Sequence, residues 1–214
     1  MTASQNLPEF LIDAPGGPGP APLTFAFAHG AGAPMDTPFM SFFAEALVER
    51  GWRVVRFEFP YMARRRREPK RPPPDRQPLL LETWRQVIAS LGAERLVIGG
   101  KSMGGRMASL IADEAGVRGL ACLGYPFHPA GRPERLRTAH LAALQTPCLI
   151  CQGSRDALGN AAEVAGYDLA ESVRLHWAAD GDHDLKPRKG SGRSTEQNWD
   201  EAAAAVDGFF RSLI

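Results

Sequence analysis

The sequence has few cysteines, no long apolar run and almost no net charge. Nowhere do about 18 consecutive apolar residues occur, the length that a helix needs to cross a bilayer. Its start also lacks the basic and apolar regions of a secretory signal. These absences predict a cytoplasmic protein with no membrane partner.

The charges of the chain nearly cancel. Its 214 residues include 25 Lys and Arg against 24 Asp and Glu, which gives a net charge of +1. Such a balance does not favour nucleic acid as a partner through the overall field of the protein. It leaves the oligomeric state open.

The three cysteines are too few for a disulfide framework in a chain of this size. Cys148 and Cys151 match the C-x-x-C pattern of redox and zinc sites, but they lie in an apolar run that reads as a strand. Residues three apart on a strand point to opposite faces. We therefore expect two buried cysteines, and the sequence predicts neither a metal nor a cofactor.

Hydrophobic residues make up 44% of the chain and charged residues 23%, as in ordinary globular proteins. The length suits a single α/β domain over residues 1–214, with residues 1–22, rich in Pro and Gly, as an irregular lead-in. Apolar runs predict strands at 23–28, 52–59, 95–99, 117–123, 147–152 and 173–178. Helical patterns occur at 38–50, 79–91, 103–115, 135–144, 161–170 and 199–213.

This alternation predicts βαβ crossovers and a mainly parallel sheet with helices on both faces. In such sheets, ligands bind beyond the carboxyl ends of the strands. The stretch 62–78 contains consecutive prolines and four successive arginines, and we expect it to be an irregular, non-helical loop.

The segment VIGGKSMGGR, residues 97–106, is open to two interpretations. A phosphate-binding loop ending in Gly-Lys-Ser would need glycine where Arg95 stands. The dinucleotide fingerprint also fails, because Met35 occupies the place of its third glycine after Gly30 and Gly32. The alternative is G-x-S-x-G, a serine nucleophile at a sharp turn between a strand and a helix. Its strand, its small neighbours and its following helix favour Ser102 as that nucleophile.

A serine nucleophile needs a base, and the base needs an orienting acid. In α/β-hydrolases these follow in the order Ser, Asp or Glu, His, each after a later strand. Among the histidines after Ser102, only His183 lies in a loop that leaves room for an acid before it. Asp156 follows the strand at 147–152 and is the predicted acid. Three aspartates beside the base, expected to make turns, are rivals by sequence proximity: Asp180, Asp182 and Asp184.

Two backbone N–H groups should stabilise the oxyanion that forms during attack. One is expected from Met103, which follows the nucleophile, and the other from the loop after the first apolar strand. Ala31 is the predicted donor in that loop, with Gly30 or Gly32 as alternatives. His29 is interpreted as a turn residue that shapes the hole.

Six motifs in register resemble those of the small dienelactone-hydrolase-like group of α/β-hydrolases. They are HGAGAPMD, FEFPYM, GGKSMGGRMAS, GYPFHPAGRPE, QGSRDALG and GDHDLKPRKGSG, and the resemblance covers about residues 23–214. That group includes bacterial hydrolases and eukaryotic relatives, one branch of which is a subunit of an acetyltransferase complex. The resemblance implies a three-layer α/β-hydrolase fold with trimmed N-terminal strands and no cap domain. It also implies a triad of Ser102, Asp156 and His183. Dienelactone hydrolase itself uses a cysteine nucleophile, so its substrate is not implied.

The resulting hypothesis is a serine hydrolase that acts on an ester, a thioester or a related acyl substrate. The alternative is a non-catalytic protein-interaction domain that kept the fold. Two basic loops, 64–71 and 186–193, should rise on the active-site edge. They either attract an anionic substrate or are ordinary solvated loops, and a nucleic-acid patch is a third interpretation.

Overall fold

The computed structural model describes residues 7–16, 20–68 and 71–214. The strands are β1 (Phe10–Asp13), β2 (Thr24–Ala28), β3 (Arg53–Phe57), β4 (Leu96–Lys101), β5 (Gly119–Leu123), β6 (Cys148–Gly153) and β7 (Val173–Ala178). The helices are α1 (Pro38–Glu49), α2 (Pro60–Arg67), α3 (Gln77–Leu91), α4 (Met103–Ser109), α5 (Ala112–Ala115), α6 (Ala161–Val164) and α7 (Thr195–Arg211). Two single 3₁₀ turns lie at Leu141–Ala143 and Lys189–Ser191.

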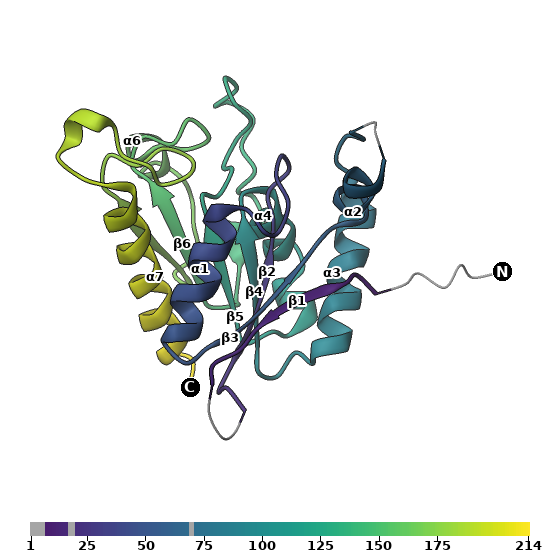
Figure 1. Cartoon of the computed structure of the whole chain (residues 1–214). Coiled ribbons are helices and arrows are strands. Elements are labelled where there is room, and N and C mark those ends of the chain that lie inside the picture. Colours follow the sequence, from purple (N-terminus) through teal and green to yellow (C-terminus); the bar gives the residue numbers. More distant parts are fainter. Residues whose placement is uncertain (1–6, 17–19, 69–70) are drawn as a thin grey trace.

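These strands form a seven-stranded sheet in the order β1-β3-β2-β4-β5-β6-β7. Every neighbouring pair is parallel except β1 with β3. The carboxyl ends of β2 to β7 therefore meet at one edge of the sheet, at the top of Figure 1, whereas the C-terminus of the chain lies at the opposite end. This arrangement confirms the predicted mainly parallel sheet.

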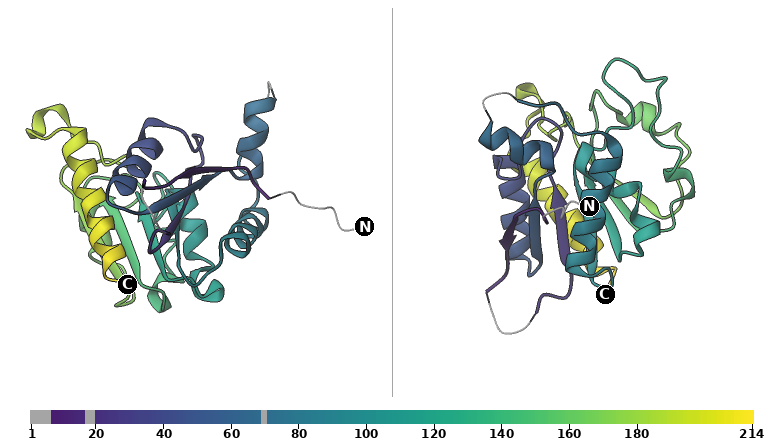
Figure 2. Two further views of the ribbon diagram at one scale, coloured as in Figure 1. Left: turned by 60° about the horizontal axis from the view of Figure 1, so that its bottom comes forward. Right: turned by 90° about the vertical axis from the view of Figure 1, so that its right-hand side faces the viewer.

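Helices cover both faces of the sheet (Figure 2). On one face, α1 and α7 pack on alternate strand residues such as Phe27 and Leu149. On the other, α3 and α4 pack on residues such as Ile98 and Cys148. Cys148 and Cys151 belong to opposite faces, as their spacing predicted, and burial raises the pKa of the Cys151 thiol, which keeps it protonated.

The structure corrects the expected irregularity of two segments. The lead-in 1–22 contains β1, which pairs with β3 along its whole length. Residues 60–67 form α2, although the stretch from 62 was predicted to be non-helical. The triple proline lies after this helix, and Pro60 occupies its first turn, where no backbone N–H is needed.

Three predicted helices are shorter than expected. The pattern at 135–144 yields only a 3₁₀ turn, because the backbone N–H of Arg137 donates to the carbonyl of Phe127 in a neighbouring loop. The pattern at 161–170 stops at Val164. The pattern at 103–115 divides into α4 and α5. Conversely, α7 starts four residues before the predicted 199, at a capping box formed by Ser194 and Gln197.

No helix among the residues that the structure describes is long and apolar enough to span a membrane. The same residues include no cap domain over the carboxyl edge, where only loops and the short α2 and α6 lie above the strands.

Candidate active site

Ser102 lies at the sharp turn between β4 and α4 in a strained backbone conformation. Its φ of 52° and ψ of −116° are unfavourable for a residue with a side chain. The turn also brings three backbone segments together. A Cβ atom at Gly100 would come within 2.3 Å of the carbonyl oxygen of Ala28, and one at Gly104 within 2.6 Å of that of His29. Glycine at these positions is therefore a steric requirement of the turn.

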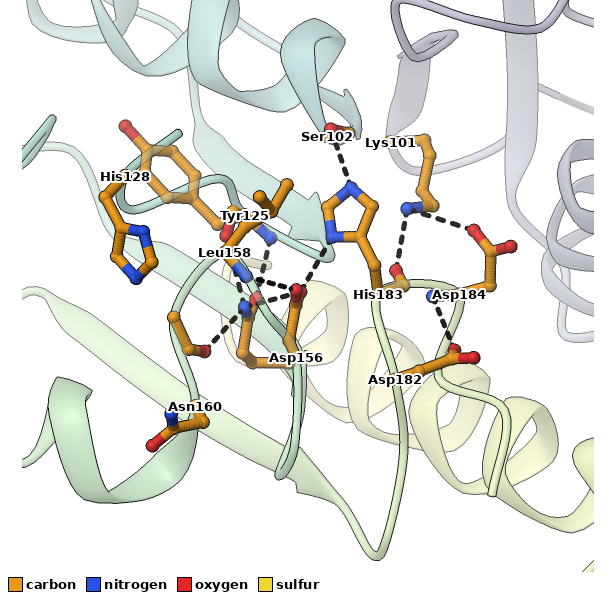
Figure 3. A network of polar contacts seen from close by, with 12 residues as sticks. Lys101, Ser102, Tyr125, His128, Asp156, Leu158, Asn160, Asp182, His183 and Asp184 are labelled. Atoms are coloured by element: carbon orange, nitrogen blue, oxygen red, sulfur yellow. Dashed lines mark hydrogen bonds and ion pairs between the residues drawn. The ribbon is translucent and has the colours of Figure 1, made fainter. Parts of the chain in front are cut away.

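The structure brings the three predicted triad residues into one hydrogen-bonded chain (Figure 3). The Oγ of Ser102 lies 2.8 Å from Nε2 of His183, and Nδ1 of His183 lies 2.7 Å from Oδ2 of Asp156. The residues come from the loops after β4, β7 and β6, respectively. Their meeting follows from the parallel sheet, which places these three strand ends at one edge.

Asp156 is fully buried, and its carboxylate accepts hydrogen bonds on both oxygens. Oδ1 accepts from the backbone N–H of Leu158 at 2.8 Å, and Oδ2 accepts from Nε2 of Gln152 at 2.8 Å as well as from His183. The Gln152 amide also joins both backbone groups of Tyr125. These bonds fix the carboxylate in place and offset the cost of its burial.

Lys101, which precedes Ser102, holds the loop that carries His183. Its buried Nζ donates to the carbonyl of His183 at 2.7 Å and lies 3.3 Å from a carboxylate oxygen of Asp184. Burial lowers the pKa of Lys101, and the charge of Asp184 opposes this shift. Lys101 thus joins β4, which leads to Ser102, to the loop of His183, as Figure 3 shows.

His29 is buried in the loop after β2 and has a defined tautomer. Its Nε2 lies 3.1 Å from the backbone N–H of Phe59 and can only accept there. Its Nδ1 therefore carries the proton and donates to the carbonyl of Gly30 at 2.6 Å. Burial lowers the pKa of His29 to about 4, which keeps the ring neutral. The residue shapes this turn, in agreement with its interpretation from the sequence.

Two side chains of α2 orient the peptide groups of the same loop. The hydroxyl of Tyr61 donates to the carbonyl of Ala31 at 3.1 Å, and Arg65 donates to the same oxygen at 3.2 Å. Burial raises the pKa of Tyr61, so its hydroxyl keeps the proton that it donates. Neither the N–H of Ala31 nor that of Met103 donates to an acceptor within residues 7–16, 20–68 and 71–214.

The three aspartates near His183 in the sequence form ion pairs or turn hydrogen bonds and do not contact its ring. Asp180 pairs with Arg155 and Arg188, at 3.3 and 2.5 Å. Oδ1 of Asp182 accepts from two backbone N–H groups of its own turn, those of residues 184 and 186. Asp184 contacts Lys101. Among the four aspartates, Asp156 is the one whose carboxylate contacts the ring of His183.

The predicted basic loops are largely neutralised within the chain. In the first, Arg64 pairs with Asp75 at 2.6 Å, Arg66 pairs with Glu58 at 2.6 Å and with Asp36 at 2.8 Å, and Arg67 pairs with Glu9 at 3.5 Å. In the second, Arg188 pairs with Asp180, Arg193 with Glu201 and Lys186 with Asp184. Lys70 of the first loop lies outside the described residues, and most described arginines of the two loops have a partner of opposite charge.

Two cavities meet at Ser102. One of about 400 Å³ extends over the loop after β2 and the start of α1, and is also bordered by Lys101, His183 and Trp199. The other, of about 470 Å³, extends over α4 and the loop after β5. Ala31 lines both, so the loop that carries it lies between them. The space around Ser102 therefore extends in two directions.

Sequence reasoning missed Gln152, Lys101, Tyr61 and Arg65. Gln152 offered the clearest signal, since a glutamine is unusual in the buried apolar strand Cys148–Gly153 and lies four residues before Asp156. The contacts of the other three join segments that are far apart in the chain, and the sequence contains no local pattern that marks them.

Known structures with the same architecture support this description of the fold. An α/β serine hydrolase without lid from Xanthomonas campestris superposes with a TM-score of 0.69 at 20% identity, covering 95% of this chain and 88% of that one. A serine hydrolase homologue from Coxiella burnetii gives 0.68 at 18%, with 96% and 91% covered. Est1E from Butyrivibrio proteoclasticus, with ferulic acid bound, gives 0.71 at 16%, with 95% and 94% covered.

The sequence itself assigns the chain to a family. Residues 21–211 match the family described as an alpha/beta hydrolase domain, which is most of the chain and includes every residue of the hydrogen-bonded Ser102, His183 and Asp156. The chain belongs to this α/β hydrolase domain family.

Proposed function

We propose that this protein is a serine hydrolase that cleaves ester or thioester bonds through an acyl-enzyme intermediate. The observation that carries the proposal is the hydrogen-bonded chain from Ser102 through His183 to Asp156 at a strained turn. A strained serine aligned with a histidine and a buried carboxylate is costly to maintain, and it is the arrangement that activates a serine for attack. The family and the serine hydrolases of the same fold support a hydrolase.

In the first half of the reaction, Ser102 Oγ attacks the substrate carbonyl carbon while Nε2 of His183 takes its proton. The Asp156 carboxylate holds the proton on Nδ1 and stabilises the imidazolium. The protonated His183 then gives its proton to the leaving alcohol or thiol, and the acyl group stays on Ser102.

In the second half, His183 takes a proton from a water molecule that attacks the acyl carbon. Collapse of the tetrahedral intermediate releases the carboxylic acid and returns the proton to Oγ of Ser102. The N–H groups of Met103 and Ala31 donate to the oxyanion in both halves. The bonds from Tyr61 and Arg65 to the carbonyl of Ala31 keep that loop in position.

Replacement of the nucleophile tests the proposal. Ser102→Ala should abolish labelling by a fluorophosphonate probe and lower kcat/KM for short 4-nitrophenyl esters at least about a thousandfold. Ser154→Ala is the matched control, since Ser154 follows β6 at the same edge of the sheet and its hydroxyl should not be needed. Labelling that persists in folded Ser102→Ala protein would refute Ser102 as the nucleophile. A folded wild-type protein that neither labels nor cleaves esters would favour a non-catalytic domain.

A further inference from the structure

The second cavity beside Ser102 contains two arginines whose charge is not paired by any described carboxylate. Arg106 and Arg137 both line this space of about 470 Å³. Neither forms an ion pair within the part of the chain that the structure describes. Asp75 also lines the cavity, but its carboxylate binds Arg64 and the backbone N–H of Tyr61.

Arg106 is fixed close to the nucleophile. Its backbone N–H donates to the carbonyl of Ser102 at 3.0 Å, which places it one helical turn further along α4. The Nε of its guanidinium is buried and has no hydrogen-bond partner within the described ranges. A buried N–H donor normally has a hydrogen-bond acceptor. The lack of one at Nε of Arg106 indicates that a bound ligand supplies the acceptor.

Arg137 belongs to the loop after β5, and its backbone is held firmly. Its N–H donates to the carbonyl of Phe127 at 2.7 Å, and its own carbonyl accepts from the Tyr125 hydroxyl at 3.3 Å. No hydrogen bond joins its guanidinium to the described residues. These backbone bonds keep residue 137 in the wall of the cavity.

The surroundings of Arg106 do not compensate its charge. Burial lowers the pKa of Arg106, and the charge of Arg137 lowers it further, so the two guanidinium groups repel each other. His140, bonded to Ser109 on the same helix, is neutral, because burial and the charge of Arg106 lower its pKa to about 4. Tyr125 favours the charged arginine, but its own pKa is raised by burial, and it too is neutral.

We propose that Arg106 and Arg137 bind a carboxylate carried by the substrate, so that the enzyme prefers esters or thioesters of which one part is anionic. This inference rests on the proposed function. It follows from two unpaired guanidinium groups in a cavity that opens onto Ser102. Guanidinium groups bind carboxylates with charge-assisted, often bidentate hydrogen bonds.

The remaining lining defines the shape of the anionic part. Apolar side chains make up most of it, including Leu80, Met103, Met107 and Leu158. A singly charged carboxylate on a short hydrocarbon chain suits such walls better than a phosphate, whose larger charge costs more to remove from water. Arg106 lies about 6 Å from Ser102 along α4, so we expect the carboxylate a few carbon atoms from the scissile carbonyl.

Matched pairs of esters test this preference on each side of the scissile bond. Mono(4-nitrophenyl) glutarate is compared with neutral 4-nitrophenyl pentanoate, which places the charge on the acyl part. The second pair, 4-acetoxybenzoate and phenyl acetate, places it on the leaving group. In at least one pair, Arg106→Gln and Arg137→Gln should each lower kcat/KM of the anionic ester about tenfold or more, and that of the neutral ester by less than about threefold. The control is Arg132→Gln, an exposed arginine of the same loop, which should change neither.

The outcomes separate this inference from the proposed function. Cleavage of neutral esters that depends on Ser102, with no selective loss of either anionic ester in the two arginine variants, overturns the inference and leaves the function intact. If no ester is cleaved, the inference is tested by glutarate binding. The rise in unfolding temperature that glutarate causes is measured for wild type and for Arg106→Gln. An equal rise in both proteins, or tighter binding of inorganic phosphate than of glutarate, also overturns the carboxylate assignment.

Discussion

Two groups of arginines lie near Ser102, those of α2 and the pair Arg106 and Arg137, and the groups differ in what their side chains face. On the side of α2, every one of the four consecutive arginines has an acceptor within the chain. On the side of α4, Arg106 and Arg137 have no carboxylate partner among the described residues. The arginines of α2 are more numerous, but the positive charge of Arg106 and Arg137 is the charge that remains available to a ligand.

This difference shows that a run of basic residues in a sequence does not predict how much positive charge is available to bind a ligand. The arginines of α2 serve the protein itself: Arg66 neutralises the buried Glu58, and Arg65 holds the carbonyl of Ala31. By contrast, Arg106 and Arg137 are not part of any basic run in the sequence. Because neither guanidinium has a partner among the described residues, both retain the capacity to bind an anion. We therefore expect an anionic substrate to bind in the second cavity and not at the two basic loops.

Acid should weaken the α2 side through His29. Its pKa is about 4 in the folded protein, against about 6.5 for an unperturbed histidine. Above pH 6.5 the ring is neutral in both states. As the pH falls from 6.5 to 4, only the unfolded chain takes up the proton, so the free energy of unfolding decreases, by up to about 3 kcal/mol.

The measurement is urea unfolding at several pH values for wild type and His29→Gln. His140, near Arg106, also has a pKa lowered to about 4 and contributes to both proteins, so the informative quantity is the difference between their slopes. The variant should lose less stability between pH 6.5 and 4 than wild type. Identical slopes would show that His29 is not held neutral by burial.

Arg66→Met should destabilise the α2 side, because it leaves the buried carboxylate of Glu58 without its cation. That carboxylate is only 6% exposed, whereas the Arg66 side chain is 40% exposed. Solvent that enters beside Arg66 reduces the penalty, so we expect a loss of about 2 kcal/mol in the free energy of unfolding, below the usual cost of breaking a buried pair. Restored stability in the double variant with Glu58→Gln would identify the unpaired charge as the cause, and its absence would contradict it.

The sequence predicted the sheet well because its elements depend on local patterns. Apolar runs and glycine stops placed the six parallel strands, and the helices α1 and α3 began and ended within two residues of their expected bounds. The errors arose where bonds to distant segments decide the conformation. Residues 135–144 have a helical pattern, yet Arg137 donates its N–H to Phe127, and α2 is stabilised by partners such as Glu58 and Asp75.

The candidate site shows the same division. Ser102, His183 and Asp156 follow from chain order and from strand ends, and the structure brings them together. Their supporting residues could not be predicted, because Lys101 reaches a loop 82 residues away and Gln152 bonds a residue 27 positions before it. The α/β hydrolase family is shown, while the narrower resemblance to the dienelactone-hydrolase-like group stays a prediction.

Removal of the Arg106 guanidinium should have little effect on stability. Arg106→Met should leave the free energy of unfolding unchanged or raise it by up to about 1 kcal/mol, although its guanidinium is partly buried. The substitution removes a desolvated donor without a partner and its repulsion with Arg137, and the methionine side chain keeps contact with the apolar walls. Urea unfolding at pH 7, with Arg132→Met as the exposed control, measures the change, and an unaltered m-value would show that the unfolded state is the same. A loss comparable to that of Arg66→Met would mean that Arg106, like the arginines of α2, stabilises the fold, and the two groups of arginines would then no longer differ.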